Sequence, residues 1–381
     1  MAERFDFAVI GAGVFGSWTA HFLRDSGSVI LLDAHGPANS RASSNGESRI
    51  IRMGYGGDPL YTGMAKRALP LWKQLSDRVR KRLFHRTGVL WLAMGPETYT
   101  PRVLASLEDA GVVTERLSQD DLHQRFPQIA GDDINWALLE PESGVLLARQ
   151  AVQALVEELI DAGVAYRHEG VLAPAGTGRL HSVRTLSGTT VEAREFIFAC
   201  GPWLGHIFPE LLRARLFITR QEVFFFGVPA GTDVFSPPAM PVWICMGEQA
   251  YGFPDMEGRG FKLAIDRHGP EFDPEDGVRI VTPEGLHAAR EALGRRFPQL
   301  RGAPVLDSRV CQYENTSSGN FLIDRHPGFD NVWVVGGGSG HGFKHGPVVG
   351  EYVSNLILKG GPQEQRFSLV GKMTTQNREV F

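Results

Sequence analysis

A glycine-rich turn near the N-terminus constrains the fold of this chain more than any other feature. Gly11, Gly13 and Gly16 form the pattern Gly-x-Gly-x-x-Gly. The turn follows an apolar run at residues 5–10 that predicts a buried strand, and it opens helical spacing at residues 15–23. In such a strand–turn–helix unit the first glycine permits the bend, the second lets the backbone approach a pyrophosphate, and the third lets the helix pack on the strand.

The residues beyond this turn favour a dinucleotide ligand. Val14 and Phe15 begin the predicted helix, whose positive N-terminal end would face the pyrophosphate. A second predicted strand, residues 29–32, ends at Asp33, and a carboxylate there accepts hydrogen bonds from an adenosine ribose. Asp33 argues against a ligand with a 2′-phosphate, but it does not separate NAD from FAD. A glycine turn that serves packing alone is the alternative.

The order of the expected elements indicates an α/β (α+β two-domain) protein. The strand–turn–helix pattern returns at 332–358, and residues 151–162 have the spacing of an amphipathic helix. Residues 216–310 predict strands with one helix at 283–297. We therefore predict a Rossmann-like nucleotide-binding domain with an inserted antiparallel β-sheet substrate domain. The nucleotide-binding domain would be discontinuous, with segments 1–85, 145–215 and 311–381, and the substrate domain would comprise 86–144 and 216–310.

The bulk composition excludes several kinds of partner and site. The net charge of −4 creates no general field that would attract nucleic acid or an anionic membrane. No run of apolar residues is long enough to span a membrane. The three cysteines, Cys200, Cys245 and Cys311, include no Cys-x-x-Cys pair, so we expect neither a metal site nor a disulfide framework. Cys200 and Cys245 are expected to be packing residues.

The ends of the sequence carry no targeting pattern. The N-terminal segment MAERFDFAVIGAG leads directly into the first predicted strand, without a basic region and a long apolar region. The last residues, NREVF, do not match a peroxisomal signal of the SKL type. We therefore expect a cytoplasmic protein.

Four further motifs are more specific than the glycine turn, and they occur in order along the chain. They are SSNGESRIIR at 43–52, YGFP at 251–254 leading to FKL at 261–263, VCQY at 310–313, and GSGHGFK at 338–344. With them the chain resembles, over nearly its whole length, the monomeric sarcosine oxidase and N-methyltryptophan oxidase family of the D-amino-acid-oxidase superfamily.

This resemblance implies FAD rather than NAD as the cofactor, held covalently by a thioether from Cys311. It implies a monomeric oxidase of a small secondary or N-methylated amino acid. In the implied reaction a hydride passes from the carbon of the C–N bond to flavin N5, the imine hydrolyses, and O2 is reduced to hydrogen peroxide. Three alternatives stay open: an oxidase of glycated (Amadori, or fructosyl) amino acids, a dehydrogenase with a non-oxygen acceptor, and a flavin-binding module without turnover.

Two arginines in the 43–52 motif are candidates for binding a substrate carboxylate. Arg49 and Arg52 lie three residues apart, so both guanidinium groups would share a face if the segment were helical. A guanidinium matches a carboxylate through two hydrogen bonds. The resemblance implies that Arg52 and Lys344 bind the carboxylate and that Arg49 lies close to the flavin. Taken alone, the two arginines favour a solvated helix face.

A lysine and two tyrosines complete the expected catalytic set. In a strand, Lys262 faces the side opposite to Phe261 and Leu263. Strand alternation alone therefore allows Lys262 to be a solvated lysine on the outer face of the sheet. The resemblance instead implies that Lys262 lies by the flavin ring, where a positive charge favours formation of superoxide from oxygen. Tyr251 and Tyr313 would line the substrate pocket; their alternative is a role as core aromatics.

The resemblance also implies FAD contacts outside the N-terminal turn. Besides Arg49, Cys311 and Lys344, these residues are Ser43, Ser44, Val171, Gly201, Trp203, Gly338, Gly340, His341, Gly342 and Phe343. Asn45 and Asp266 stand where the family has histidines, and His268, a candidate base, comes two residues after Asp266. These departures leave the substrate side chain open, because an acid at 266 suits a second cationic or hydroxylated group.

Overall fold

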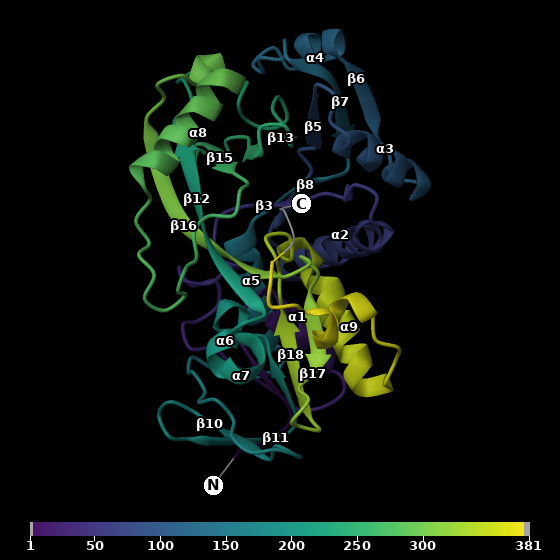
Figure 1. Cartoon of the computed structure of the whole chain (residues 1–381), viewed down its shortest axis with the longest axis vertical. Helices are drawn as coiled ribbons and strands as arrows, with labels where there is room; N and C mark the ends of the chain where they lie inside the picture. The colour runs from purple at the N-terminus through teal and green to yellow at the C-terminus, as the bar shows by residue number, and fades with distance from the viewer. Residues whose placement is uncertain (1–2, 377–381) are drawn as a thin grey trace.

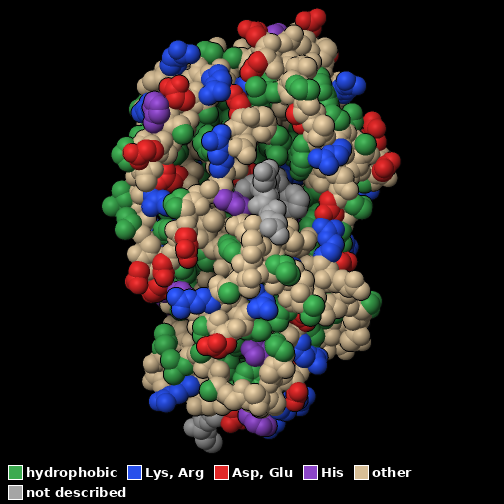
Figure 2. Space-filling view, in the orientation of Figure 1, with side chains coloured by type: hydrophobic (Ala, Val, Ile, Leu, Met, Phe, Trp, Pro, Cys, Tyr) green, Lys and Arg blue, Asp and Glu red, His purple; other side chains and the backbone are tan. Residues whose placement is uncertain are grey.

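The computed structural model describes residues 3–376. The last five residues, whose sequence differs from a peroxisomal signal, lie outside the described residues. Figure 1 shows two bodies stacked along the long axis, each built on a large sheet. Acidic, basic and apolar side chains are interspersed on the face in Figure 2, as expected for a chain of small net charge.

The lower body contains a seven-stranded sheet in which β1, β2, β11 and β18 are parallel neighbours. Its spatial order is β17-β18-β11-β1-β2-β9, and β10 pairs with β11. The strands are β1 (Glu3–Ile10), β2 (Val29–Leu32), β9 (Ala165–Arg167), β10 (Ser182–Arg184), β11 (Thr190–Phe198), β17 (Leu322–Arg325) and β18 (Val332–Gly336). Residues 7–10 of β1 and all of β2 are buried on both faces of the sheet, which explains why these stretches are apolar without alternation.

Helices cover this sheet because its apolar faces must be buried. α1 (Val14–Leu23) packs against both α9 (Gly346–Lys359) and α5 (Ala148–Asp161). Gly350 permits the close crossing of α1 and α9, since a Cβ there would lie 2.4 Å from the backbone carbon of Trp18. α2 (Pro59–Val79) packs beside α9, and the short helices α6 (Leu204–Ile207) and α7 (Pro209–Leu212) follow β11.

The upper body contains an eight-stranded sheet in the order β16-β12-β15-β14-β13-β5-β7-β6. Its strands are β5 (Val89–Met94), β6 (Glu115–Ser118), β7 (Ile134–Glu140), β12 (Leu216–Phe226), β13 (Val242–Cys245), β14 (Ala250–Phe253), β15 (Phe261–Ile265) and β16 (Val305–Thr316). Every pairing is antiparallel except that of β5 with β13. Its helices are α3 (Tyr99–Asp109), α4 (Gln119–Arg125) and α8 (Pro283–Arg296).

The predicted two-domain fold class is thus confirmed, and both segments assigned to the substrate domain supply strands to the upper sheet. The exact domain boundaries stay a prediction, because β16 runs unbroken through the boundary placed between 310 and 311.

A small third sheet corrects the expectation for the two arginines. β3 (Arg49–Ile51) pairs with β8 (Gly144–Leu146), which also pairs with β4 (Phe84–His85). The segment is therefore a strand and not a helix. Its β-branched Ile50 and Ile51 lie opposite Val145 and Gly144, where they fit a pleated surface better than a helix.

Within residues 3–376, no helix is both long enough and apolar enough to cross a membrane. In the same range, no three histidine, cysteine or acidic side chains are grouped so that they could hold a metal ion.

Candidate active site

A cavity of about 400 Å³ lies at the carboxyl ends of β1, β2 and β11. Ligands of open α/β sheets bind at this edge. Most of the residues that we expected to contact FAD line it: Gly11, Gly13, Val14, Phe15, Asp33, Ser43, Ser44, Arg49, Val171, Gly201, Trp203, Cys311, Gly338, Gly340, Gly342 and Phe343. Gly16, His341 and Lys344 do not line this cavity and are placed below.

The glycine turn has the close approaches that the sequence pattern predicts. Gly11 has φ +109°, and a Cβ there would lie 2.3 Å from the carbonyl oxygen of Ala199. A Cβ on Gly16 would lie 1.8 Å from the carbonyl oxygen of Gly11, so Gly16 serves helix–strand packing. Gly13 leaves open the cavity wall at the N-terminus of α1. A bare backbone beside a helix N-terminus in a cavity wall fits the diphosphate of FAD.

Asp33 is held by the turn itself. One carboxylate oxygen accepts from Ala12 N at 2.7 Å, and the other accepts from His35 N at 2.9 Å and Gly36 N at 2.8 Å. These bonds fix the carboxylate at the end of β2, in the cavity wall.

Cys311 lies where β16 passes the cavity, and its thiol is half-buried. Arg49 Nη2 lies 3.7 Å from Cys311 Sγ and donates to Ser43 O at 2.9 Å. Burial raises the pKa of the Cys245 thiol to about 12, and it also raises that of the Cys200 thiol. Cys200 lines the same cavity as Cys311, but its thiol donates to Ile10 O at 3.5 Å.

A smaller cavity of about 70 Å³ adjoins the large one, with which it shares Arg49, Tyr313, Gly340 and Phe343 in its walls. Arg52, Lys262 and Lys344 all line it, and their exposed fractions are only 5%, 3% and 5%. The three cations come from different parts of the chain, after β3, on β15 and in a 3-10 turn (Phe343–His345). The alternative of solvated surface side chains is wrong for Arg52 and Lys262.

Aromatic rings and a buried carboxylate position Arg52. Its guanidinium carbon lies 4.6 Å from the ring centre of Tyr55 and 4.8 Å from that of Trp91, and Nη1 donates to Gly54 O. Glu140 holds the neighbouring backbone by accepting from Met53 N at 2.7 Å and Gly54 N at 3.2 Å. Glu140 also accepts from Trp91 Nε1 at 2.8 Å. Trp91 and Glu140 were not among the predicted site residues.

Lys344 is positioned by Tyr55 and by the glycine turn. Its Nζ donates to Tyr55 Oη at 2.7 Å and to His341 O at 3.1 Å. Tyr55 Oη also lies 2.7 Å from His345 Nε2. Burial, together with the charges of Lys344 and Arg52, holds the pKa of His345 well below its usual value, so this histidine is neutral. Tyr55 and His345 therefore support Lys344 without adding a charge.

Lys262 bonds to the motif that contains Arg49, and both residues line the small cavity. Its Nζ donates to Ser48 O at 3.0 Å and Ser48 Oγ at 3.2 Å, and lies 4.3 Å from the ring centre of Phe253. Burial first, and then the charge of Arg49, hold the pKa of Lys262 well below the ordinary lysine value. The ammonium is therefore easily deprotonated until an anion stabilises it.

Tyr313 joins the predicted pocket tyrosines to Asp266. Tyr313 Oη donates to Asp266 Oδ1 at 3.1 Å. Burial, and then the charge of Asp266, raise the pKa of both Tyr313 and Tyr251, so both phenols are neutral donors. Asp266 lines the small cavity, whereas His268 does not. His268 Nδ1 lies 3.1 Å from Gln376 Nε2. Asp266, and not His268, is the titratable group from this segment at the cavity.

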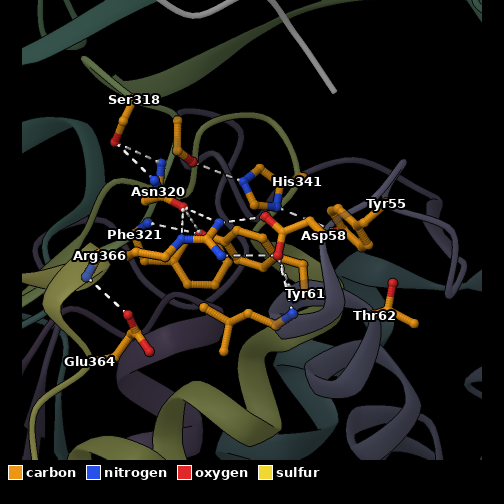
Figure 3. Close-up of polar contacts among 12 residues, drawn as sticks. Tyr55, Asp58, Tyr61, Thr62, Ser318, Asn320, Phe321, His341, Glu364 and Arg366 are labelled. Atoms are coloured by element: carbon orange, nitrogen blue, oxygen red, sulfur yellow. Dashed lines mark hydrogen bonds and ion pairs between the residues drawn. The ribbon is translucent and has the colours of Figure 1, made fainter. Parts of the chain in front are cut away.

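Behind His341 lies a polar network that the sequence did not predict (Figure 3). His341 Nε2 lies 3.0 Å from Gly319 O, so its ring points away from the large cavity. Next to it, Arg366 donates to Asp58 and to Asn320 Oδ1, and Tyr61 Oη donates to the same Asn320 oxygen at 3.1 Å. The network ties the C-terminal segment to the start of α2 and to the turn after β16.

Comparison with known proteins decides the family. Residues 6–356 match the family model described as DAO, FAD dependent oxidoreductase. The chain belongs to this family of FAD-dependent oxidoreductases. The expectations of an enzyme and of FAD as its cofactor are confirmed.

Individual members of the DAO family extend the comparison. Human peroxisomal sarcosine oxidase is 32% identical over 368 residues, covering 94% of this chain and 93% of that protein. N-methyl-L-tryptophan oxidase from Salmonella arizonae is 28% identical, covering 94% and 96%. The resemblance drawn from the sequence motifs is thereby confirmed.

Solved structures of more distant DAO-type enzymes share the fold. L-proline dehydrogenase from P. horikoshii has a TM-score of 0.83 at 20% identity, covering 97% of this chain and 98% of that one. Amadoriase I from Aspergillus fumigatus has a TM-score of 0.79 at 22% identity, covering 99% and 94%. At these identities the likeness extends to the fold alone.

Proposed function

We propose that this protein is an FAD-dependent oxidase of the C–N bond of a small secondary or N-methylated amino acid, with O2 as electron acceptor. The observation that carries this proposal is the convergence of Arg52, Lys344 and Lys262 on one small buried cavity beside the cofactor cavity. Guanidinium and ammonium groups that line one cavity favour a ligand with a carboxylate. The sarcosine and N-methyltryptophan oxidases, which are 32% and 28% identical to this chain, support the same substrate class.

Arg52 and Lys344 would bind the substrate carboxylate. The guanidinium of Arg52 is held between two rings, and Lys344 Nζ is oriented by Tyr55. Both donors are therefore fixed before the substrate arrives, which lowers the entropy lost on binding. A carboxylate in the small cavity would also offset the desolvation of both cations.

With the substrate carboxylate bound, Tyr251 and Tyr313 would line the pocket around the substrate amine and exclude water. Because both phenols are neutral, they add no negative charge that would stabilise the ammonium form of the substrate. When bound, FAD supplies the electron acceptor for oxidation of the C–N bond, and O2 then takes up the electrons to give hydrogen peroxide. Lys262 would hold a positive charge where superoxide first forms.

We further propose that Cys311 forms a thioether to the flavin and that the enzyme acts as a monomer. Cys311 lies in the cavity wall, and Arg49 Nη2 lies 3.7 Å from its sulfur. Acid precipitation of the native protein should leave a yellow pellet, whereas Cys311→Ser should release the colour into the supernatant. A colourless native pellet would refute the covalent link.

The test of the function is a bleaching screen of the purified yellow protein under nitrogen, followed by admission of air. The panel contains secondary, N-methyl, cyclic and fructosyl amino acids. Bleaching by a secondary or N-methyl amino acid, with colour and hydrogen peroxide returning in air, supports the proposal. Bleaching by fructosyl amino acids alone favours the Amadori alternative. Bleaching that air does not reverse favours a dehydrogenase with another acceptor.

A further inference from the structure

Glu314, on β16, is a buried acid whose side chain lines the large cavity. Its exposed fraction is 6%, and its Oε1 receives no hydrogen bond from any residue that the structure describes. A buried carboxyl oxygen without a partner costs free energy that the native state normally recovers from a hydrogen bond. The position of this oxygen in a cavity wall means that a ligand can supply the partner.

The carboxyl group lies between the ends of two parallel strands. A Cβ added at Gly336, the last residue of β18, would lie 2.5 Å from Glu314 Oε1. A Cβ added at Gly201, just after β11, would lie 4.0 Å from Oε2. Glycine at both positions therefore leaves room for the carboxyl group at the edge of the sheet where dinucleotides bind.

No ion pair to this carboxyl group is formed by the residues that the structure describes. The other titratable side chains that line the cavity are Asp33, His35, Arg49, Cys200, Glu275, Cys311 and Tyr313. The ring of His35 packs against Trp203, with ring centres 5.3 Å apart. Arg49 lines the same cavity, but it donates to Ser43 and lies against Cys311. Burial raises the pKa of Glu314 to about 7, and the backbone N–H groups of Gly337 and Gly338 oppose that rise. The neutral acid is thus present at neutral pH and below.

We propose that Glu314 is a cofactor-binding residue that, as a neutral acid, donates a hydrogen bond to an oxygen of the ribityl–diphosphate chain of FAD. The diphosphate is an anion, so an ionised carboxylate in the same cavity would repel it, whereas a carboxylic acid donates to it. This assignment rests on the FAD binding of the family and not on the proposed substrate. It makes the affinity for FAD dependent on pH.

The test measures FAD binding by flavin fluorescence in full-length protein carrying Cys311→Ser, so that flavin release is reversible. If only the acid form binds, the Kd should rise by up to about 30-fold between pH 6 and pH 8.5, because each further pH unit above 7 removes tenfold more of that form. Glu314→Gln retains an N–H donor and cannot ionise. It should bind FAD at both pH values with a much flatter dependence.

Glu195→Gln is the matched control, since Glu195 lies on β11 but not in the cavity wall. It should keep the full pH dependence. A Kd that is equal at pH 6 and pH 8.5 with Glu314 intact overturns the proposal, even if the Glu314 variant does not fold. An unchanged pH dependence in Glu314→Gln overturns it as well. A protein that passes this test but is not reduced by any amino acid would retain this inference and refute the proposed function.

Discussion

At the scale of single residues, the site is built from charges that are buried before any substrate is present. Arg52 lies between two aromatic rings, Lys344 bonds to a phenol, and Lys262 bonds to a backbone carbonyl and a serine hydroxyl. These contacts hold the three side chains in place. A substrate carboxylate would add charge-assisted hydrogen bonds at Arg52 and Lys344.

The first prediction concerns that carboxylate. Converting the best substrate to its amide should raise KM strongly, because truncating one side of a buried hydrogen-bonded charge pair costs about 2–5 kcal/mol. Lys344→Met should raise KM for the acid and reduce the difference between acid and amide. Steady-state kinetics on both compounds measures this. Equal KM values for acid and amide in the native enzyme would contradict the assignment.

Glu140 gives a second residue-scale prediction. It accepts hydrogen bonds from Met53 N, Gly54 N and Trp91 Nε1, so it shapes the loop and the ring that hold Arg52. In Glu140→Gln an NH2 group replaces one carboxylate oxygen and cannot accept a hydrogen bond. Each hydrogen bond that is lost costs about 1–3 kcal/mol. KM for the amino acid should rise about tenfold or more, with a smaller change in kcat.

The control for Glu140 is its exposed neighbour Glu142, which pairs with Arg86 at the surface. Glu142→Gln should leave both kinetic constants unchanged. A Glu140→Gln enzyme that loses kcat at constant KM would show that Glu140 does not act through Arg52.

At the scale of elements, the start of α2 links the C-terminal segment to the site. Asp58 is the N-cap of α2, accepting from Leu60 N at 3.1 Å, and it also pairs with Arg366. Loss of an N-cap costs about 1 kcal/mol. Because the Arg366 side chain is 36% exposed, its ion pair should add less than about 1 kcal/mol.

Asp58→Ala should therefore lower the free energy of unfolding by about 1–2 kcal/mol, since it removes both interactions. Asp58→Asn keeps a capping oxygen and should lose less. Denaturant unfolding followed by circular dichroism measures both. Equal losses in the two variants would show that the charge, and not the cap, is what α2 needs.

Whether a segment forms a helix or a strand was predictable wherever the hydrophobic pattern of that segment alone decides it. The second predicted strand has the bounds of β2, and the helix expected at 283–297 is α8, Pro283–Arg296. The residue spacing around Arg49 did not predict a strand, because the partner strand β8 lies about 95 residues further along the chain and spacing alone does not show that pairing. Pairing at that distance decides between strand and helix for so short a segment.

At the scale of the whole molecule, two sheets that contain no common strand form the walls of one site. Cys311, Tyr313 and Glu314 lie on β16, a strand of the upper sheet, and all three line the cavity of the lower body. No linker therefore separates the two bodies along this strand. The motif resemblance predicted the first two residues. It did not predict Glu314 or Glu140. The sequence pattern that could have indicated them is an acidic residue within or at the end of an apolar strand.

The central claim is that Lys262 makes this flavoenzyme an oxidase, and Lys262→Met tests it most directly. Flavin reduction by substrate is followed without oxygen, and reoxidation is followed after mixing the reduced enzyme with O2. Loss of the charge should slow reoxidation by orders of magnitude, since each factor of ten is about 1.4 kcal/mol, with a smaller effect on reduction.

The rate of reoxidation should also change with pH in a direction that the same test can measure. Because the pKa of Lys262 is held well below the ordinary lysine value, its charge is lost as pH rises through that lowered pKa. Reoxidation of the native enzyme should therefore be fast at low pH and slower at high pH, whereas Lys262→Met should be slow at every pH. A Lys262→Met enzyme that reoxidises as fast as the native one would contradict the oxidase assignment.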